Sequence, residues 1–547
     1  MELDEERRYT KLSPFELKNK LIALASEHSE RTLLNAARGN PNWIALEPRH
    51  AFMQLGLFAL EESAKAPLAP GFGTARLPPE LEPRFCQFAA KSAGIPGIEF
   101  LQRYFDYAAR SLGIARESLL QELAGAILGD HYPTPPRMLP LTERIVRAFL
   151  MQELLALCGD DRFDLFAVEG ATAGVAYLFD SLFESKLLAK GDAIAIGTPI
   201  FTPYLELPLL NDYALVEIRI KQDPERGWHY PAAELAKLRD PRIKALLLVN
   251  PSNPTAQCLD QRTLDALAHI VETDRPDLVV ITDDVYATFV PHFVSLAALI
   301  PHNTVLIYSC SKFWGTTGWR LGVIALHQDN VLDRRICAMP ALHQALFRKR
   351  YHSIAVDPCR LRFIDRLVAD SRRVGFNHTA GLSTPQQAQM ALCALHVLAD
   401  EARQYTHYAR AIVRRRFEAL HASAGIALPA DAHCTCYYAT IDIPAMARSR
   451  HGEAFAAWLK KSFPPIDFVV QLAEKKGIVL LDGGGFDAPQ MSVRVSLANL
   501  ADEAYVKIGQ GISELLGDYH TLWQQSRFRA GGGRTSGAGA DQDFVSK

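Results

Sequence analysis

The sequence predicts an α/β protein whose core is a mostly parallel β-sheet. Seven short apolar runs lie in a regular series, at 164–168, 193–197, 214–220, 244–249, 278–282, 304–308 and 321–326. Most of them are separated by segments long enough for a helix, and strands that alternate with helices pair in parallel under a helical cover. The composition agrees, since 48% hydrophobic and 22% charged residues are ordinary for a globular protein.

A chain of 547 residues is long enough for several domains. We expect an N-terminal segment (1–60) that packs on the small domain, a mostly helical insertion (61–134), a large domain with a seven-stranded sheet (135–345), a smaller α+β domain (346–526) and a disordered Gly- and Ser-rich tail (527–547). Within the small domain, the sequence predicts helical stretches at 346–375 and 386–422 and strands at 435–442, 478–481 and 491–497.

The net charge and the cysteine content limit the partners and the compartment that we expect for this protein. A net charge of −2 gives no reason to expect binding to nucleic acid or to an anionic membrane. We see no secretory signal at the N-terminus and no apolar run of the roughly 18 residues that a membrane helix needs. Nine scattered cysteines predict reduced thiols in the cytoplasm. The trio His433, Cys434 and Cys436 lacks a second ligand pair at metal-site spacing, so we expect no metal.

Small and polar residues follow the predicted strands, at the edge of the sheet where open α/β folds bind ligands. These residues are Ala171, Thr172, Phe201, Asn253, Asp283, Tyr286, Ser309, Ser311 and Lys312, with Arg320 nearby. The start of a helix, hydroxyls and an arginine suit a phosphate. An aromatic face suits a ring, a carboxylate suits a pyridinium nitrogen, and a lysine suits an imine. Together they indicate pyridoxal 5′-phosphate (PLP) as the cofactor.

Four motifs occur in the order and spacing of one known family. They are NPSNPT at 250–255, DDVY at 283–286, SCSKFWGTTGWRLG at 309–322 and RVSLA at 494–498. The chain therefore resembles the class I and II aminotransferases, which have the PLP-dependent transferase fold type I. The likeness is close over roughly 135–325 and looser over 376–500. One departure is Ala256, where the family usually has glycine.

The resemblance implies a role for each matching residue. Lys312 would form the imine with PLP and move the substrate proton, and Arg494 would bind the substrate α-carboxylate. Asp283 would pair with the pyridine nitrogen, while Tyr286 and Asn253 would hydrogen-bond the ring hydroxyl and Phe201 would stack on the ring. The phosphate would be held by Ala171, Thr172, Ser309, Ser311 and Arg320, and by Tyr132 of a neighbouring copy, which implies a homodimer at least.

Other segments resemble the aspartate 4-decarboxylase (L-aspartate β-decarboxylase) family over nearly the whole chain. They are SPFELK at 13–18, NAARGNPNW at 35–43, HYPTPPR at 131–137 and NHTAGLSTPQ at 377–386. This likeness implies conversion of L-aspartate to L-alanine and CO2, with side aspartate aminotransferase activity that uses 2-oxo acids such as pyruvate or 2-oxoglutarate. It also implies a larger assembly of dimers. Arg38 is the candidate contact of the β-carboxylate, with Lys18 and Thr379 shaping the entrance.

The sequence is also compatible with other functions and with other roles for single residues. The chain could be a plain aspartate or aromatic aminotransferase, or a PLP-fold transcriptional regulator, although its first 60 residues contain no basic helix pair for DNA. Single residues also have ordinary structural explanations. Arg494 could form a surface salt bridge, Phe201 could belong to the core, and Arg38 and Lys18 could be solvated.

Overall fold

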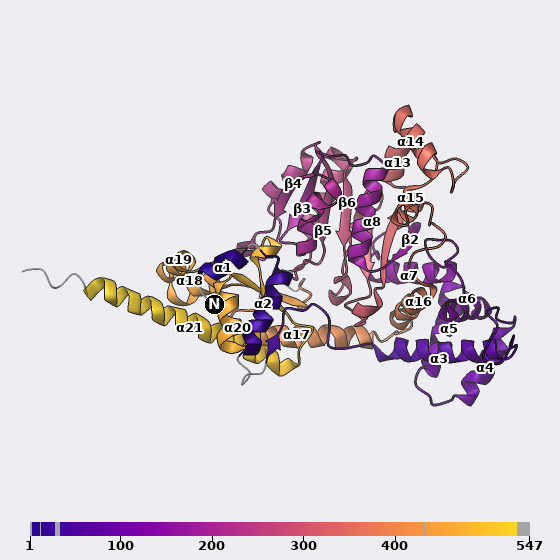
Figure 1. Cartoon of the computed structure of the whole chain (residues 1–547), viewed down its shortest axis with the longest axis horizontal. Helices are drawn as coiled ribbons and strands as arrows, with labels where there is room; N and C mark the ends of the chain where they lie inside the picture. The colour runs from indigo at the N-terminus through magenta and orange to yellow at the C-terminus, as the bar shows by residue number, and fades with distance from the viewer. Residues whose placement is uncertain (1–2, 11, 28–32, 430–432, 533–547) are drawn as a thin grey trace, which may run out of the picture. The chain divides into compact units, whose positions relative to one another are not determined.

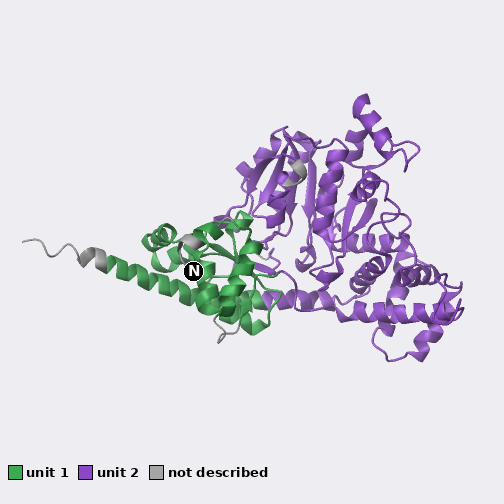
Figure 2. Cartoon of the chain, viewed as in Figure 1, with its two compact units in different colours: residues 1–38, 416–428, 439–547 green, residues 39–415, 429–438 purple. Residues whose placement is uncertain are grey.

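The computed structural model describes residues 3–10, 12–27, 33–429 and 433–532, and the chain divides into two compact units (Figure 2). Unit 1 contains residues 1–38, 416–428 and 439–547, and unit 2 contains residues 39–415 and 429–438. The domain limits predicted from the sequence divide the chain differently, because they assign residues 1–60 to the small domain. Those limits stay a prediction.

The central sheet of unit 2 has seven strands in the order β2-β8-β7-β6-β5-β3-β4 (Figure 1). The strands are β2 (Phe163–Val168), β3 (Ala193–Thr198), β4 (Val216–Lys221), β5 (Ile243–Val249), β6 (Val279–Asp283), β7 (Thr304–Ser309) and β8 (Gly322–His327). Only β8 runs antiparallel to its sheet neighbours, β2 and β7. All seven predicted strands are present, and the predicted α/β fold class is confirmed.

Helices pack against this sheet and bury hydrophobic side chains on it. α8 (Ala171–Glu184) contacts β2, β7 and β8, and α15 (Phe363–Ser371) packs on α8 and β2. The short helices α10 (Ala232–Ala236) and α12 (Leu296–Leu299) and the longer α11 (Gln261–His269) share a buried cluster with the strands, to which Leu246, Val280 and Leu267 belong. Burying each such side chain contributes about 1.5–3 kcal/mol, so the cluster holds these helices on the sheet.

A second group of helices in unit 2 surrounds α16 (Thr384–Leu398), which is buried along almost its whole length. Its neighbours are α3 (Leu46–Ala64), α5 (Ile98–Leu112), α6 (Arg116–Leu128) and α7 (Pro140–Glu153), while α4 (Leu81–Lys91) packs on α6. The other helices of unit 2 are α9 (Thr202–Leu205), α13 (Val331–Cys337) and α14 (Ala341–Tyr351). In the described part of the chain, every helix is too short or too polar to cross a lipid bilayer.

Unit 1 is an α+β unit with two small sheets. β1 (Leu34–Asn35) pairs with β10 (Ile478–Val479), and β12 (Ser492–Ser496) lies between β11 (Leu481–Asp482) and β9 (Tyr438–Asp442). Its helices are α1 (Leu3–Tyr9), α2 (Pro14–Glu27), α18 (Ile443–His451), α19 (Glu453–Ser462), α20 (Asp467–Lys476) and α21 (Asp502–Gly532), and α17 (Gln404–Ala424) runs across the boundary of the units. α21 thus continues into the tail predicted to be disordered, of which 533–547 lie outside the described residues.

Candidate functional site

The register of the central sheet brings the predicted residues at the strand ends together. Asp283, the last residue of β6, pairs with Val249 at the end of β5, and the Asn250 N–H donates to the Asp283 carbonyl at 3.0 Å. On the other side of β7, Ser309 pairs with Gly322 at the start of β8. The residues that the sequence analysis selected therefore share one edge of the sheet.

Asp283 is the buried carboxylate of this edge, with a side chain only 4% exposed. The Tyr204 hydroxyl donates to its Oδ2 at 2.6 Å, and the Val285 N–H donates to its Oδ1 at 3.3 Å. Burial raises the pKa of Asp283 to about 6, although the Tyr204 hydrogen bond and the Lys312 charge act in the opposite direction. The carboxyl group is thus poised to ionise near neutral pH and to hold a positive ring nitrogen. Sequence reasoning missed Tyr204.

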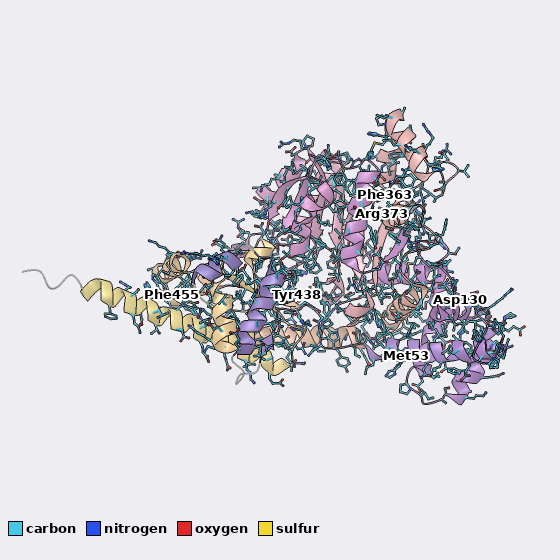
Figure 3. All side chains as sticks on the ribbon, viewed as in Figure 1. Met53, Asp130, Phe363, Arg373, Tyr438 and Phe455 are labelled. Carbon is cyan, nitrogen blue, oxygen red and sulfur yellow. The ribbon has the colours of Figure 1, made fainter. Side chains whose placement is uncertain are left out.

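Lys312 lies beside backbone and phenol groups, and its charge also acts on the Asp283 carboxylate. Its Nζ donates to the Gly39 carbonyl at 3.3 Å, and the Tyr437 hydroxyl donates to the same carbonyl at 2.8 Å. The hydroxyls of Tyr286 and Tyr438 are 2.9 Å apart. Tyr438, labelled in Figure 3, is the first residue of β9. The amine and the phenols can donate or accept a proton, while the Gly39 carbonyl accepts hydrogen bonds from Lys312 and Tyr437.

A cradle for an anion forms where β2 leads into α8. Gly170 has φ +90°, and a Cβ there would lie 2.3 Å from Nη2 of Arg320, so only glycine allows the guanidinium to come so close. A Cβ at Gly322 would lie 2.6 Å from the Gly170 backbone. The first turn of α8 contains no acidic residue, and its free N–H groups attract anions. The site therefore fits a phosphate dianion.

Two hydroxyls complete the lysine side of this cradle. Ser309 Oγ lies 2.9 Å from Ser311 Oγ, and both side chains are buried. The neighbouring strand ends contribute the ring-facing candidates. The Phe201 ring meets the Tyr204 ring edge-on with centroids 5.4 Å apart, Asn253 is buried, and the Thr172 side chain bonds to Tyr204. Ala171 is the first residue of α8.

A segment far upstream holds the loop that carries Lys312. Arg49 of α3 donates from Nη1 to the Trp314 carbonyl at 3.1 Å and from Nη2 to the Gly315 carbonyl at 2.7 Å. Its guanidinium carbon also lies 4.7 Å from the centroid of the Trp319 ring. Trp43 donates to the Phe313 carbonyl at 3.2 Å. The sequence contains no signal for this contact, because about 270 residues separate the partners.

Two predicted residues of unit 2 lie on its surface. Tyr132 is 62% exposed, and Thr379 is also exposed, with its hydroxyl donating to the Phe376 carbonyl at 3.2 Å. Their predicted roles toward a phosphate and at the entrance of the site stay predictions.

In unit 1, Arg494 lies on β12 and is only 1% exposed. Its Nη2 donates to the Ala37 carbonyl at 2.6 Å, and its guanidinium carbon lies 5.2 Å from the centroid of the Phe486 ring. Arg38 follows Ala37 directly and is exposed, and Lys18 is half-buried on α2. The fold thus brings Arg494 next to the segment that carries Arg38, and it contradicts the alternative of Arg494 as a surface residue.

The comparison with known proteins agrees with this geometry. The model of "Aminotransferase class I and II" matches residues 164–508. A Pseudomonas protein named bifunctional aspartate aminotransferase and L-aspartate beta-decarboxylase is 45% identical over 521 residues, which are 95% of this chain and 98% of that protein. An aspartate aminotransferase of Pyrococcus abyssi is 33% identical over 26% of this chain and 36% of its own length.

Solved structures with the same fold cover nearly the whole chain. Aspartate aminotransferase of Thermus thermophilus with maleate has a TM-score of 0.57 at 16% identity, and covers 92% of this chain and 96% of its own. An aromatic aminotransferase of Pyrococcus horikoshii has a TM-score of 0.56 at 18% identity, with 90% and 99% covered. At such identities the likeness concerns the fold alone.

Proposed function

Because this chain belongs to the class I and II aminotransferase family, we propose that it is a PLP enzyme that converts L-aspartate to L-alanine and CO2, with aspartate transamination as a side activity. The observation that carries the proposal is the 45% identity to the bifunctional Pseudomonas protein over 95% of the chain. That match extends well beyond residues 164–508, the part that resembles aminotransferases in general. The resemblance to a decarboxylase in the N-terminal segments is therefore supported by a relative of nearly full length.

The residues at the sheet edge fit PLP. Lys312 would hold the cofactor covalently, Asp283 would hold its ring nitrogen, and Arg320 with Ser309 and Ser311 would hold its phosphate. The cradle at Gly170 supports this assignment, because a side chain at that position would collide with Arg320. When bound, PLP supplies an electron sink that accepts electron pairs from bonds broken in the substrate.

The protein provides binding and proton transfer for that chemistry. Arg494 would bind the α-carboxylate of aspartate through two parallel hydrogen bonds. Lys312 Nζ would take the proton from Cα and return it at a later step, as a general base and then a general acid. Asp283 is shielded from water, so its negative charge stabilises a protonated ring nitrogen more strongly than it would in solvent.

Decarboxylation requires that the β-carboxylate be oriented and then released. A tight clamp on this group would stabilise the bound substrate more than the transition state. Arg38 is exposed to solvent, so a single contact of its side chain with the β-carboxylate fits it better than a buried clamp. Lys18 and Thr379 would shape the entrance.

We extend the proposal to the cellular compartment, the assembly state and the co-substrates of the enzyme. The enzyme would act in the cytoplasm as a homodimer at least, and as part of a larger assembly of dimers. The exposed Tyr132 would contact the phosphate of a neighbouring copy. Pyruvate or 2-oxoglutarate would restore PLP after a side transamination. We propose no nucleic-acid partner and no metal.

The test uses purified holoenzyme and L-aspartate without any added oxo acid. Sustained release of CO2 with an equal amount of alanine over many turnovers would support the β-decarboxylase, and pyruvate should reverse any slow inactivation. A single turnover that bleaches the PLP absorption band, with no CO2 unless 2-oxoglutarate is added, would make the protein a plain aspartate aminotransferase.

A further inference from the structure

The hydroxyl of Tyr438 and the amine of Lys312 both lie close to Gly39. The Tyr438 side chain is 2% exposed, and its hydroxyl is 2.9 Å from the Tyr286 hydroxyl. A Cβ built on Gly39 would lie 2.4 Å from Tyr438 Oη and 3.5 Å from Lys312 Nζ. The phenol and the amine therefore both border the space that a side chain at position 39 would fill, although 126 positions separate Lys312 from Tyr438 in the sequence.

Aromatic rings surround the phenol of Tyr438. The Tyr438 ring centroid is 5.4 Å from that of Tyr286 and 5.1 Å from that of Tyr437, and the Tyr437 centroid is 5.0 Å from that of Phe289. Tyr437 also donates to the Gly39 carbonyl, the acceptor of Lys312, and so fixes the backbone between the two groups. Because the Tyr438 side chain is buried among these rings, a proton delivered from this side comes from its phenol hydroxyl.

The proposed reaction needs such a proton at a second carbon. When the bond between Cβ and the β-carboxylate breaks, CO2 leaves and the electron pair finally returns to Cβ, which must then gain a proton to become a methyl group. Lys312 already serves Cα, one bond away. A separate weak acid next to Lys312 would allow the two carbons to be protonated independently.

We propose that Tyr438 is the acid that protonates Cβ. The proposal rests on the β-decarboxylase function above. The O–H bond of Tyr438 breaks as the new C–H bond forms, and the electron pair left by CO2 becomes that bond. The Tyr286 hydroxyl, 2.9 Å away, stabilises the resulting phenolate. The phenolate then takes a proton from water, which supplies the one proton that the conversion of aspartate to alanine and CO2 consumes. The Tyr286 hydroxyl thus has a second task besides its role toward PLP.

The test is Tyr438→Phe, which removes only the hydroxyl. A general acid contributes roughly 10²- to 10⁴-fold, so alanine formation should fall at least about 100-fold. The conversion of PLP by aspartate in a single turnover, which does not involve Cβ, should change less than about threefold. Tyr308→Phe is the control, because it removes another buried phenol of unit 2, whose hydroxyl lies 3.4 Å from the Thr288 hydroxyl.

A second measurement does not depend on the rate. Aspartate with one deuterium at Cβ, turned over in tritiated water, gives a methyl group whose handedness can be read. The wild type should give one handedness, and the residual product of Tyr438→Phe should be racemic, because water then protonates either face. The thermal midpoint of the apoenzyme and the pH titration of the PLP absorption band should stay near the wild-type values.

Several results would overturn the role of Tyr438 as the acid for Cβ. Unchanged alanine formation or retained handedness would overturn the proposal. Parallel loss of both reactions, or a shifted absorption titration, would make Tyr438 a structural support of Lys312 and would overturn it too. If the wild type itself releases no CO2, the proposed function fails and this proposal fails with it.

Discussion

Replacing Tyr204 with phenylalanine removes one hydrogen bond from the carboxylate at the centre of the site. The Tyr204 hydroxyl donates to Asp283 Oδ2 at 2.6 Å, and both side chains are buried. A hydrogen bond to a charged group is worth about 1.5–3 kcal/mol, and one pKa unit equals about 1.4 kcal/mol. The pKa of Asp283 should therefore rise by about 1–2 units, from about 6 to roughly 7–8.

The consequence for binding depends on pH. Because the pKa of Asp283 is higher in Tyr204→Phe, its ionised fraction at pH 7 falls from roughly nine-tenths in the wild type to between about one-half and one-tenth in the variant. Binding of pyridoxine 5′-phosphate, which has the ring and the phosphate but no aldehyde for Lys312, should weaken roughly 2- to 10-fold at pH 7. Near pH 9 the carboxyl group is ionised in both proteins, so most of the difference should disappear.

The stability of the folded apoenzyme depends on pH in the opposite direction from the affinity for pyridoxine 5′-phosphate. Because the pKa of Asp283 is raised in the folded protein, the folded state binds a proton more tightly than the unfolded state. The stability of the apoenzyme should therefore fall as pH rises from about 4 to about 6, and in Tyr204→Phe this fall should extend to about pH 7–8.

Equilibrium dialysis at pH 7 and pH 9, together with thermal denaturation of the apoenzyme, measures both effects. Tyr351→Phe is the matched control, since the Tyr351 hydroxyl donates to both oxygens of buried Asp370, at 3.0 and 2.9 Å. This variant should lose stability and keep its affinity for pyridoxine 5′-phosphate. Equal weakening of Tyr204→Phe at both pH values would refute the electrostatic argument.

Three further substitutions test the remaining assignments. Arg494→Lys should raise the KM for aspartate roughly 10- to 100-fold, because an ammonium cannot form the two parallel hydrogen bonds of a guanidinium; an unchanged KM would exclude it as the carboxylate clamp. Gly170→Ala should lower the free energy of unfolding by about 1–3 kcal/mol in a urea titration and displace Arg320, and an unchanged midpoint would contradict the steric argument. Arg38→Ala should change the ratio of CO2 release to transamination, and a constant ratio with a constant KM would remove Arg38 from the mechanism.

The large sheet could be predicted from the sequence because its strands are nearly continuous apolar runs. The small sheets could not. The run 478–481 looks like one strand, but Ile478–Val479 pairs with β1 while Leu481–Asp482 pairs with β12. Such two-residue strands are defined by their distant partners, and a single sequence does not contain that information.

The ends of the helices also were only partly predictable from the sequence. Residues 386–422 look like one helical stretch, and the structure has two helices, α16 and α17, with a break before Gln404. Neither glycine nor proline occurs at the break, although Arg403 adopts φ +52°. The site residues at strand ends were predictable, because topology alone places them at one edge. Tyr204, Tyr438 and Arg49 were not, since only the folded chain brings them to Asp283 and the Lys312 loop.

The hydrogen bonds from Arg49 to the Lys312 loop restrict which segments of this protein could be replaced by those of a relative. The matched aminotransferase region begins at residue 164, so the segment around Trp43 and Arg49 lies outside it. Even so, this segment binds the carbonyls of Phe313, Trp314 and Gly315. A chimera that grafts the matched region onto another N-terminus would leave those carbonyls without their donors. In this chain the loop that carries Lys312 depends on α3, so a change in one of them requires a matching change in the other.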